Sequence, residues 1–485
     1  MPPAVASGVF ALLILGLFWL DRDRSARISR ALWIAVVWWL LACTRSVGQW
    51  LQMRTPMDQQ AADQILEGGS LDFQVYSGLL ALGLFVLVKR RKQVVELLQG
   101  NGPIILFFSY CAMSIFWSDY PDVAIKHWIK ALGDLVMVLV VLTDREPYAA
   151  FERLLARITY LLIPLSILLI KFYPAIGRAY GRWSGETSYT GVALNKNGLG
   201  AICLLCGLAT VWRLLMVYQD RNGTSRTRQL MVHGVILGMV LWLFWLTKSM
   251  TSLSCFVIGS AILLLGNHRA VINSPGKVHV IVATILIVTT SVLFLNLSPD
   301  ALEAIGRNPT LTDRTDIWAL LISVSDNSLV GTGYESFWHG PRLEKILSVY
   351  SWAPRQAHNG YLEIFLNLGW VGVALLAGVM ATGYRRVIAS FRQNPQIGSL
   401  MLAYFTVGIV YNFTEAAFFR MMTPVWMFLL LAITGAMVLA NRIIQPPVDE
   451  GLDHERDPLS WPGAGIQHHD EGSPGGAVKL TGNLP

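Results

Sequence analysis

The residues with the clearest chemical potential lie in one string, RQAHNGYLE at positions 355–363. Histidine titrates near neutral pH, so His358 at a boundary between water and lipid can accept or donate a proton. Asn359, with His358, can cap the helix that follows, and Glu363 lies about one turn into that helix. The string therefore predicts either a proton-transfer site or a plain capping pair, and both interpretations stay open.

An earlier string places an arginine where a bound anion would stabilise it. The segment TDRTDIW at 312–318 is followed by GTGY at 331–334. Arg314 falls in the first turn of a predicted helix, where a cation opposes the helix dipole unless an anion lies nearby. The two glycines predict a tight turn that returns the chain toward the membrane beside Tyr334. A surface arginine without a ligand is the alternative.

A third string combines an arginine with a lysine at the start of an apolar run. It consists of GRWSG at 181–185 and LNKNG at 194–198. Arg182 and Lys196 can both contact an anion, with Asn197 as a neutral neighbour. Lys196 lies only a few residues inside the apolar run, so a side chain that snorkels to the membrane surface is the alternative.

Further ionisable residues lie inside or at the ends of apolar runs. They include Lys126, Lys130, Glu363 and Glu415. Charged groups at membrane depth are costly, so they suggest function. Most of these groups fall toward the outer face of the predicted topology. An outward-facing basic cluster above a helical bundle suits an anionic ligand that carries a lipid tail.

The elements that must position these groups are membrane helices. The 485-residue chain is 54% hydrophobic and 14% charged, against about 25% charged residues in soluble domains. This composition excludes an ordinary soluble enzyme, a disulfide scaffold and a disordered protein. A spanning helix needs about 20 apolar residues. Runs that qualify or nearly qualify begin near Ala4, Ala31, Phe73, Pro103, Ala124, Leu155, Gly191, Leu230, Leu253, Val278, Gly360, Gln396 and Met421. We therefore predict an all-α polytopic membrane protein with about 12–13 transmembrane helices.

Lysine and arginine in alternate short loops orient these spans. The positive-inside rule puts the N-terminus outside and the C-terminus in the cytoplasm. We predict ten spans in 1–296, a large outer loop at 297–359, three spans in 360–442 and a disordered cytoplasmic tail at 443–485.

The outer segments are expected to contain short helices. Residues 312–324 read as a helix with Thr312 or Asp313 as its N-cap. Apolar residues recur at helical spacing over 343–350, which predicts a helix lying on the membrane surface or on the bundle. A third short helix is predicted at 57–66.

Two other patterns invite a metal or redox interpretation. Cys203 and Cys206 form a C-x-x-C, but their apolar neighbours favour packing. His468 and His469 lie in the polar tail, where a solvated position is favoured over a metal site. We expect no metal, no cofactor and no nucleic-acid partner.

Together these strings resemble the O-antigen ligase and O-antigen polymerase superfamily of bacterial cell envelopes. WSDYP at 117–121 is similar to the W-S-x-x-P turn of that family, and the resemblance extends to Glu415. Its most specific parts are Arg314 followed by Trp318 and the H-x10-G spacing that ends at Gly369. The string NKNG at 195–198 is similar to branches that include exopolysaccharide polymerases, although it lacks the aromatic or His-rich form of other branches.

The resemblance implies a metal-independent, inverting glycosyltransferase at the periplasmic face of the bacterial inner membrane, with a mainly helical bundle and a periplasmic loop domain. Its donor would be a glycan on undecaprenyl pyrophosphate. Its acceptor would be the end of another glycan, in a polymerase of exopolysaccharide or O-antigen repeats, or the lipid A core, in a ligase. We favour the polymerase. By motif match, Arg182 and Arg314 would hold the pyrophosphate and His358 would be essential for transfer.

These roles agree with the chemistry of the side chains. Arginine binds phosphate in a bidentate manner and neutralises developing negative charge. His358 would accept the proton of the acceptor hydroxyl, while Glu363 or Glu415 would orient it or replace it as the base. Substrate contacts are expected from Lys126, Lys130, Lys196, Asn197, Tyr334, Asn359, Glu363 and Glu415. A flippase and a chain-length regulator are expected partners.

Two other classes fit parts of the pattern. A polysaccharide-related secondary transporter would explain the spans and buried charges, but such proteins show internal repeats, and none is seen here. A scaffolding subunit of an export complex would need no chemistry, which leaves the arginines and the histidine unexplained.

Overall fold

The computed structural model describes residues 1–21, 27–51, 70–180, 186–220, 226–274, 276–294, 311–350, 355–420 and 423–441. Its helices are α1 Pro3–Leu20, α2 Leu32–Cys43, α3 Val47–Leu51, α5 Ser70–Lys89, α6 Arg91–Gln99, α7 Gly102–Met113, the 3₁₀ helix η1 Ser114–Trp117, α8 Pro121–Leu142, α9 Pro147–Phe172, α10 Pro174–Gly177, α11 Lys196–Gln219, α12 Arg226–Thr247, α13 Met250–Gly266, α14 Arg269–Ile272, α15 Gly276–Phe294, α17 Leu311–Ser323, α18 Gly340–Val349, α19 Gly360–Gln393, α20 Pro395–Tyr411 and α21 Pro424–Asn441. The predicted helix at 57–66 and the tail at 443–485 lie outside the described residues.

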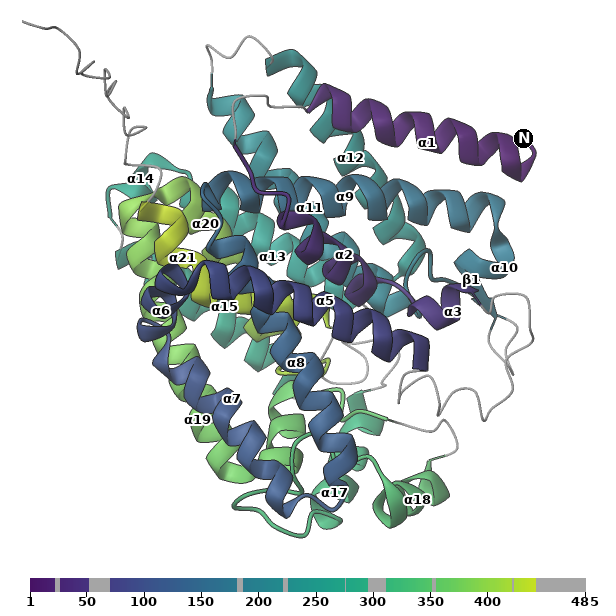
Figure 1. Ribbon diagram of the computed structural model, residues 1–485, viewed down its shortest axis with the longest axis vertical. Coiled ribbons are helices and arrows are strands. Elements are labelled where there is room, and N and C mark those ends of the chain that lie inside the picture. Colours follow the sequence, from purple (N-terminus) through teal and green to yellow (C-terminus); the bar gives the residue numbers. More distant parts are fainter. Residues whose placement is uncertain are drawn as a thin grey trace, which may run out of the picture. The chain divides into compact units, whose positions relative to one another are not determined.

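The predicted class, an all-α polytopic membrane protein, is confirmed (Figure 1). Seven described helices are long and apolar enough to cross a membrane, or eight if the bent pair α6 and α7–η1 forms one span. Four shorter apolar helices, α2, α13, α15 and α20, coincide with further predicted spans. The total of 12–13 spans stays a prediction. The structure adds a small antiparallel hairpin of β1 Arg178–Tyr180 and β2 Thr187–Tyr189, which the sequence did not predict.

The centre of the bundle is formed by α20 and α21, which are buried along most of their length. α20 packs against α13, α19 and α21, and α11 packs against α12 and α13. Glycines allow these helices to approach closely. A Cβ atom at Gly408 would lie 3.0 Å from the Leu429 side chain, and one at Gly259 would lie 2.7 Å from Leu208. Tight packing of this kind fixes the ends of α11, α19 and α20 relative to one another.

Helix α19 is broken at Gly369, where φ is +62°. The loop before α18 docks at this break: Trp370 N donates to Ser328 O at 2.9 Å, and Gly333 N donates to Asn367 O at 2.9 Å. A Cβ atom at Gly369 would lie 2.2 Å from Leu329 O. The glycine at position 369 therefore has a structural reason, because only glycine accommodates both the left-handed backbone and the docked loop.

The segment around α17 and α18 has a small core of its own, which includes Ile317, Leu321, Val324, Phe337, Trp338, Ile346, Ala357 and Leu366. The predicted amphipathic helix at 343–350 is confirmed, since α18 buries Ile346 in this core. The predicted N-cap of the preceding helix is wrong. α17 begins at Leu311, so Thr312 and Asp313 lie within its first turn. This core holds the loop before His358 against the first half of α19.

Candidate functional site

His358 lies at the turn immediately before α19. Its φ of +48° is unusual for a side chain with a Cβ atom. Asn359 is the N-cap, because its Oδ1 accepts hydrogen bonds from Tyr361 N at 3.0 Å and Leu362 N at 3.1 Å. The capping prediction is thus confirmed for Asn359. The His358 ring turns away from the cap and bonds to other side chains.

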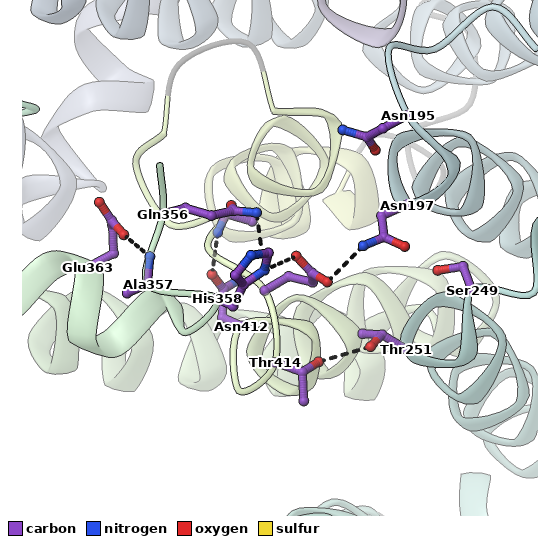
Figure 2. Close-up of polar contacts among 12 residues, drawn as sticks. Asn195, Asn197, Ser249, Thr251, Gln356, Ala357, His358, Glu363, Asn412 and Thr414 are labelled. Atoms are coloured by element: carbon purple, nitrogen blue, oxygen red, sulfur yellow. Dashed lines mark hydrogen bonds and ion pairs between the residues drawn. The ribbon is translucent and has the colours of Figure 1, made fainter. Parts of the chain in front are cut away.

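Glu415 is the carboxylate that contacts His358. Its Oε2 lies 3.2 Å from His358 Nδ1, and its Oε1 accepts a hydrogen bond from Asn197 Nδ2 at 3.1 Å. Figure 2 shows Gln356 bonded to the imidazole, and Asn197 of α11 bonded to the carboxylate that contacts the imidazole. Glu415 is 7% exposed, so its carboxylate is largely shielded from water, whereas the His358 side chain is partly exposed. Three segments distant in the sequence therefore meet at the His358–Glu415 pair.

The connection between α20 and α21 is held in place by Asn412. Asn412 Oδ1 accepts hydrogen bonds from Ala417 N at 2.8 Å and Phe418 N at 2.9 Å. Gly360 N in turn donates to Asn412 O at 2.8 Å. A Cβ atom at Gly360 would lie 2.0 Å from Asn412 Oδ1. The absence of a side chain at Gly360 is what lets the start of α19 and the end of α20 bring His358 and Glu415 together.

Two side chains of this site were not identified from the sequence. Gln356 Nε2 lies 3.2 Å from His358 Nδ1, and Gln356 Oε1 accepts a hydrogen bond from Arg420 Nη1 at 2.8 Å. Arg420 precedes the last apolar run and Gln356 belongs to the string at 355–363. A basic residue beside a span end is ordinary, so neither residue had a distinguishing signal.

Glu363 supports the chain next to His358 and makes no described contact with the imidazole. Its Oε2 accepts a hydrogen bond from Ala357 N at 2.9 Å, and its Oε1 accepts one from Trp338 Nε1 at 2.5 Å. Asn367 Nδ2 approaches the same Oε1 at 3.3 Å. Glu363 therefore holds the backbone immediately before His358. The sequence left Glu363 and Glu415 unranked as partners of the histidine, and the geometry places Glu415 in that position.

Three residues around the site share a left-handed backbone that is uncommon for side chains other than glycine. They are Glu335 with φ of +53°, His358 and Phe419 with φ of +50°. Tyr334 is buried, and its hydroxyl donates to Phe419 O at 2.5 Å. Backbone strain of this kind costs about 1–3 kcal/mol per residue and collects at functional sites. The structure gives Tyr334 a bracing contact, and its predicted contact with substrate stays a prediction.

Glu335 is a largely buried carboxyl group beside this cluster. Burial raises the pKa of Glu335 to about 7, from an ordinary value of 4.5; Arg420 counteracts this effect and Glu363 adds to it. The folded protein therefore binds this proton more tightly than the unfolded chain does. Stability from this group is lost as pH rises from about 4.5 to about 7 and stays low above that.

Replacing Glu335 with Gln should remove this loss. We expect the midpoint of thermal unfolding in detergent to rise by about 3–6 °C at pH 8 and to change little at pH 4.5. The measurement is a thermal scan of both proteins at several pH values. Glu344→Gln on the exposed face of α18 is the control. An equal effect of the Glu335 substitution at both pH values would contradict the argument.

The two lysines predicted within an apolar run lie on α8, beside an apolar cavity. Lys126 and Lys130 line a space of about 140 Å³ together with Trp38, Phe73, Tyr76, Ser77, Leu80 and Ile129. Among the described residues, neither lysine forms a salt bridge. An apolar cavity with two cations at its wall has the character expected for a lipid that carries a negative headgroup.

The remaining predicted residues have mixed outcomes. Lys196 is exposed at the start of α11, where Asn195 is the N-cap and accepts from Gly198 N at 2.8 Å (Figure 2). Arg182 and the side chain of Arg314 lie outside the described residues.

Cys203 and Cys206 are buried in α11, in agreement with a packing role. No cluster of three or more His, Cys, Asp or Glu side chains able to hold a metal was found in the described part of the chain.

Comparison with known proteins shows which proteins this chain resembles. Residues 197–377 match the family model described as O-antigen ligase. Over these residues the chain is similar to the O-antigen ligase and polymerase superfamily. It is also similar to the exopolysaccharide production protein ExoQ of Rhizobium meliloti (strain 1021), with 24% identity over 360 residues that cover 70% of this chain and 77% of the relative. The family match begins at Asn197 and includes His358, but it ends before Glu415. These findings support a membrane glycosyltransferase of the O-antigen ligase or polymerase type.

Proposed function

We propose that this protein extends a bacterial envelope polysaccharide by transferring glycan from undecaprenyl pyrophosphate at the periplasmic face of the inner membrane. The observation that supports this proposal most is the His358–Glu415 pair, which lies at the outer end of the bundle in the predicted topology. It combines a proton acceptor with a buried carboxylate that can orient it. This combination suits an enzyme that activates a sugar hydroxyl.

Glu415 determines which tautomer of the His358 imidazole is favoured. A carboxylate only accepts hydrogen bonds, so Glu415 favours the tautomer of His358 that carries its proton on Nδ1. In this tautomer Nε2 carries the lone pair, which would accept a proton from the acceptor hydroxyl. As that O–H bond breaks, the acceptor oxygen forms a bond to the anomeric carbon. The bond from this carbon to the donor phosphate breaks, and its electron pair leaves with the diphosphate. A single displacement of this type inverts the anomeric configuration.

The departing diphosphate needs cations to neutralise its charge. We assign this role to Arg182 and Arg314, on the family resemblance, and to Lys126 and Lys130, on their position beside an apolar cavity. The cavity would receive the part of the lipid next to the phosphates, while the rest of the chain stays in the bilayer. Lys196 is exposed at the same end of α11 as Asn197 and would contact the glycan or its phosphates. In this scheme these side chains neutralise the diphosphate, so the transfer needs no metal ion.

Polymerisation is favoured over ligation because the similar protein from Rhizobium meliloti is named for exopolysaccharide production. Ligation to the lipid A core remains a second candidate, since the matching family model is described as O-antigen ligase. Both reactions would use the same donor and the same proton acceptor and would differ in the acceptor. A flippase that supplies the donor and a chain-length regulator are the partners that polymerisation would need.

Deleting the gene separates the two candidates. We expect the deletion strain to lose long glycan chains and to retain single repeat units on the lipid carrier, as seen by electrophoresis and mass spectrometry of envelope glycans. Return of long chains on re-expression is the control. Long chains that stay on the lipid carrier without attachment to lipid A would identify a ligase instead. Unchanged envelope glycans would reject both reactions.

A further inference from the structure

Two side chains in the described part of the structure place opposite demands on the Nδ1 atom of His358. Glu415 Oε2 and Gln356 Nε2 each lie 3.2 Å away. An ionised carboxylate can only accept a hydrogen bond, and an amide NH₂ group can only donate one. Nδ1 satisfies Glu415 when it carries a proton and satisfies Gln356 when it does not. The same atom cannot satisfy both at once.

The orientation of the Gln356 amide follows from its other partner. Arg420 Nη1 lies 2.8 Å from the Gln356 amide, and a guanidinium group has donors and no acceptor. The oxygen of Gln356 must therefore face Arg420, and its NH₂ group must face His358. This removes the usual ambiguity between oxygen and nitrogen in a glutamine side chain.

Both competing influences come from the connection between α20 and α21, which carries Glu415 and Arg420. Glu415 is fixed by Asn197 at its other oxygen, with a distance of 3.1 Å. The described contacts bring these charged groups to the imidazole: Glu415 directly, Arg420 through Gln356, and Glu363 through the backbone at Ala357. α11 contributes the neutral Asn197. The balance at Nδ1 thus lies mainly between Glu415 and the Gln356–Arg420 pair.

We propose that Gln356, oriented by Arg420, is a positioning residue that opposes Glu415 and so limits the fraction of His358 in the base-competent tautomer. The proposal rests on the proposed function, in which Nε2 of His358 accepts the proton of the acceptor hydroxyl. Gln356 stabilises the form with a bare Nδ1 and a protonated Nε2, which cannot take that proton. It also disfavours the doubly protonated imidazolium, because this ion carries a proton on Nδ1. Any change at Gln356 should therefore alter the pH dependence of transfer.

Two substitutions separate this role from simple support of the loop. Gln356→Met keeps the length of the side chain and removes the donor. Gln356→Glu keeps a partner for Arg420 and replaces the donor with an acceptor, so both neighbours of Nδ1 favour its protonation. The acid limb of the pH–rate profile should move to higher pH in the order wild type, Met variant, Glu variant. For the Glu variant we expect a shift of about one pH unit or more, as for a carboxylate placed next to a titrating group.

The assay uses the purified protein in detergent and the lipid-linked repeat units extracted from the deletion strain. Rates are measured across pH, with kcat and KM determined separately. Gln396→Glu is the matched control, because it adds the same charge at the other end of α20, where Gln396 contacts Gln219. It should leave the acid limb in place.

Each possible result of this assay either supports or overturns the proposed role of Gln356. A graded shift of the acid limb supports the proposal. Equal loss of rate at all pH values with an unmoved limb, in both variants, means that Gln356 only supports the loop and overturns it. A shift to lower pH overturns it as well. Failure of the proposed function would show separately, as transfer that persists in a His358→Ala variant.

Discussion

Replacing His358 with alanine should abolish polymer formation while the protein still inserts into the membrane. In the proposed mechanism the imidazole accepts the hydroxyl proton, and general-base catalysis contributes about 10²–10⁴ in rate. The His358 side chain is 22% exposed and stands outside the packed core, so its loss should leave folding largely intact. The measurement is the yield of long-chain glycan in a deletion strain that expresses the variant, alongside the amount of protein in the membrane.

The matched control for this substitution is His268→Ala. His268 caps the short helix α14, far along the chain from the site, and its ring accepts from Ala270 N at 3.3 Å. Its variant should support normal polymer yield. Normal yield from the His358 variant at equal protein level would exclude a catalytic imidazole at this position and, with it, the proposed mechanism.

The second large effect is expected from Glu415→Gln, which changes one carboxylate oxygen into an NH₂ group. Asn197 donates to the oxygen of residue 415, so the new NH₂ group would face His358 Nδ1. Both neighbours of Nδ1 would then donate, and the imidazole would carry its proton on Nε2, where it cannot act as a base. An analogous carboxylate-to-amide change in serine proteases lowers kcat by about 10⁴. We expect a loss of about 10²–10⁴ in the transfer rate with KM little changed.

Glu363→Gln is the matched control, because this carboxylate also lies within the string around the histidine. Glu363 holds Ala357 N and Trp338 Nε1 and makes no described contact with the imidazole. Its variant should lose thermal stability and keep the rate within about tenfold of wild type. If the Glu363 variant lost the rate and the Glu415 variant kept it, the assignment of the orienting carboxylate would be reversed.

Some features of the site could be predicted because they depend on neighbours in the sequence. The cap at Asn359 follows from its position before an apolar run, and a cap bonds to backbone N–H groups two and three residues ahead. The amphipathic character of α18 follows from its 3.6-residue period. The membrane class follows from the length of the apolar runs. His358 at the boundary between loop and helix was found in the same way.

The sequence analysis identified Gly369 but did not predict that α19 breaks there. Gly369 was noted for its spacing from His358, but a glycine in an apolar run usually continues the helix. The break exists because the loop before α18 inserts its backbone at that point and bonds to the freed groups of Trp370 and Asn367. A backbone-to-backbone contact of this kind leaves almost no trace in side-chain composition.

The sequence by itself determined that a histidine and several ionisable groups lie toward one end of a helical membrane bundle, because local periodicity and hydropathy fix each helix and its ends. Only the tertiary structure decided that Glu415, 57 residues away, contacts His358 while Glu363, five residues away, does not. The reason is that α19 turns Glu363 toward Trp338 in the small outer core, whereas the close approach of Gly360 and Asn412 brings the end of α20 to the imidazole. Contacts of this kind arise from packing between helices, and distance along the chain does not encode them.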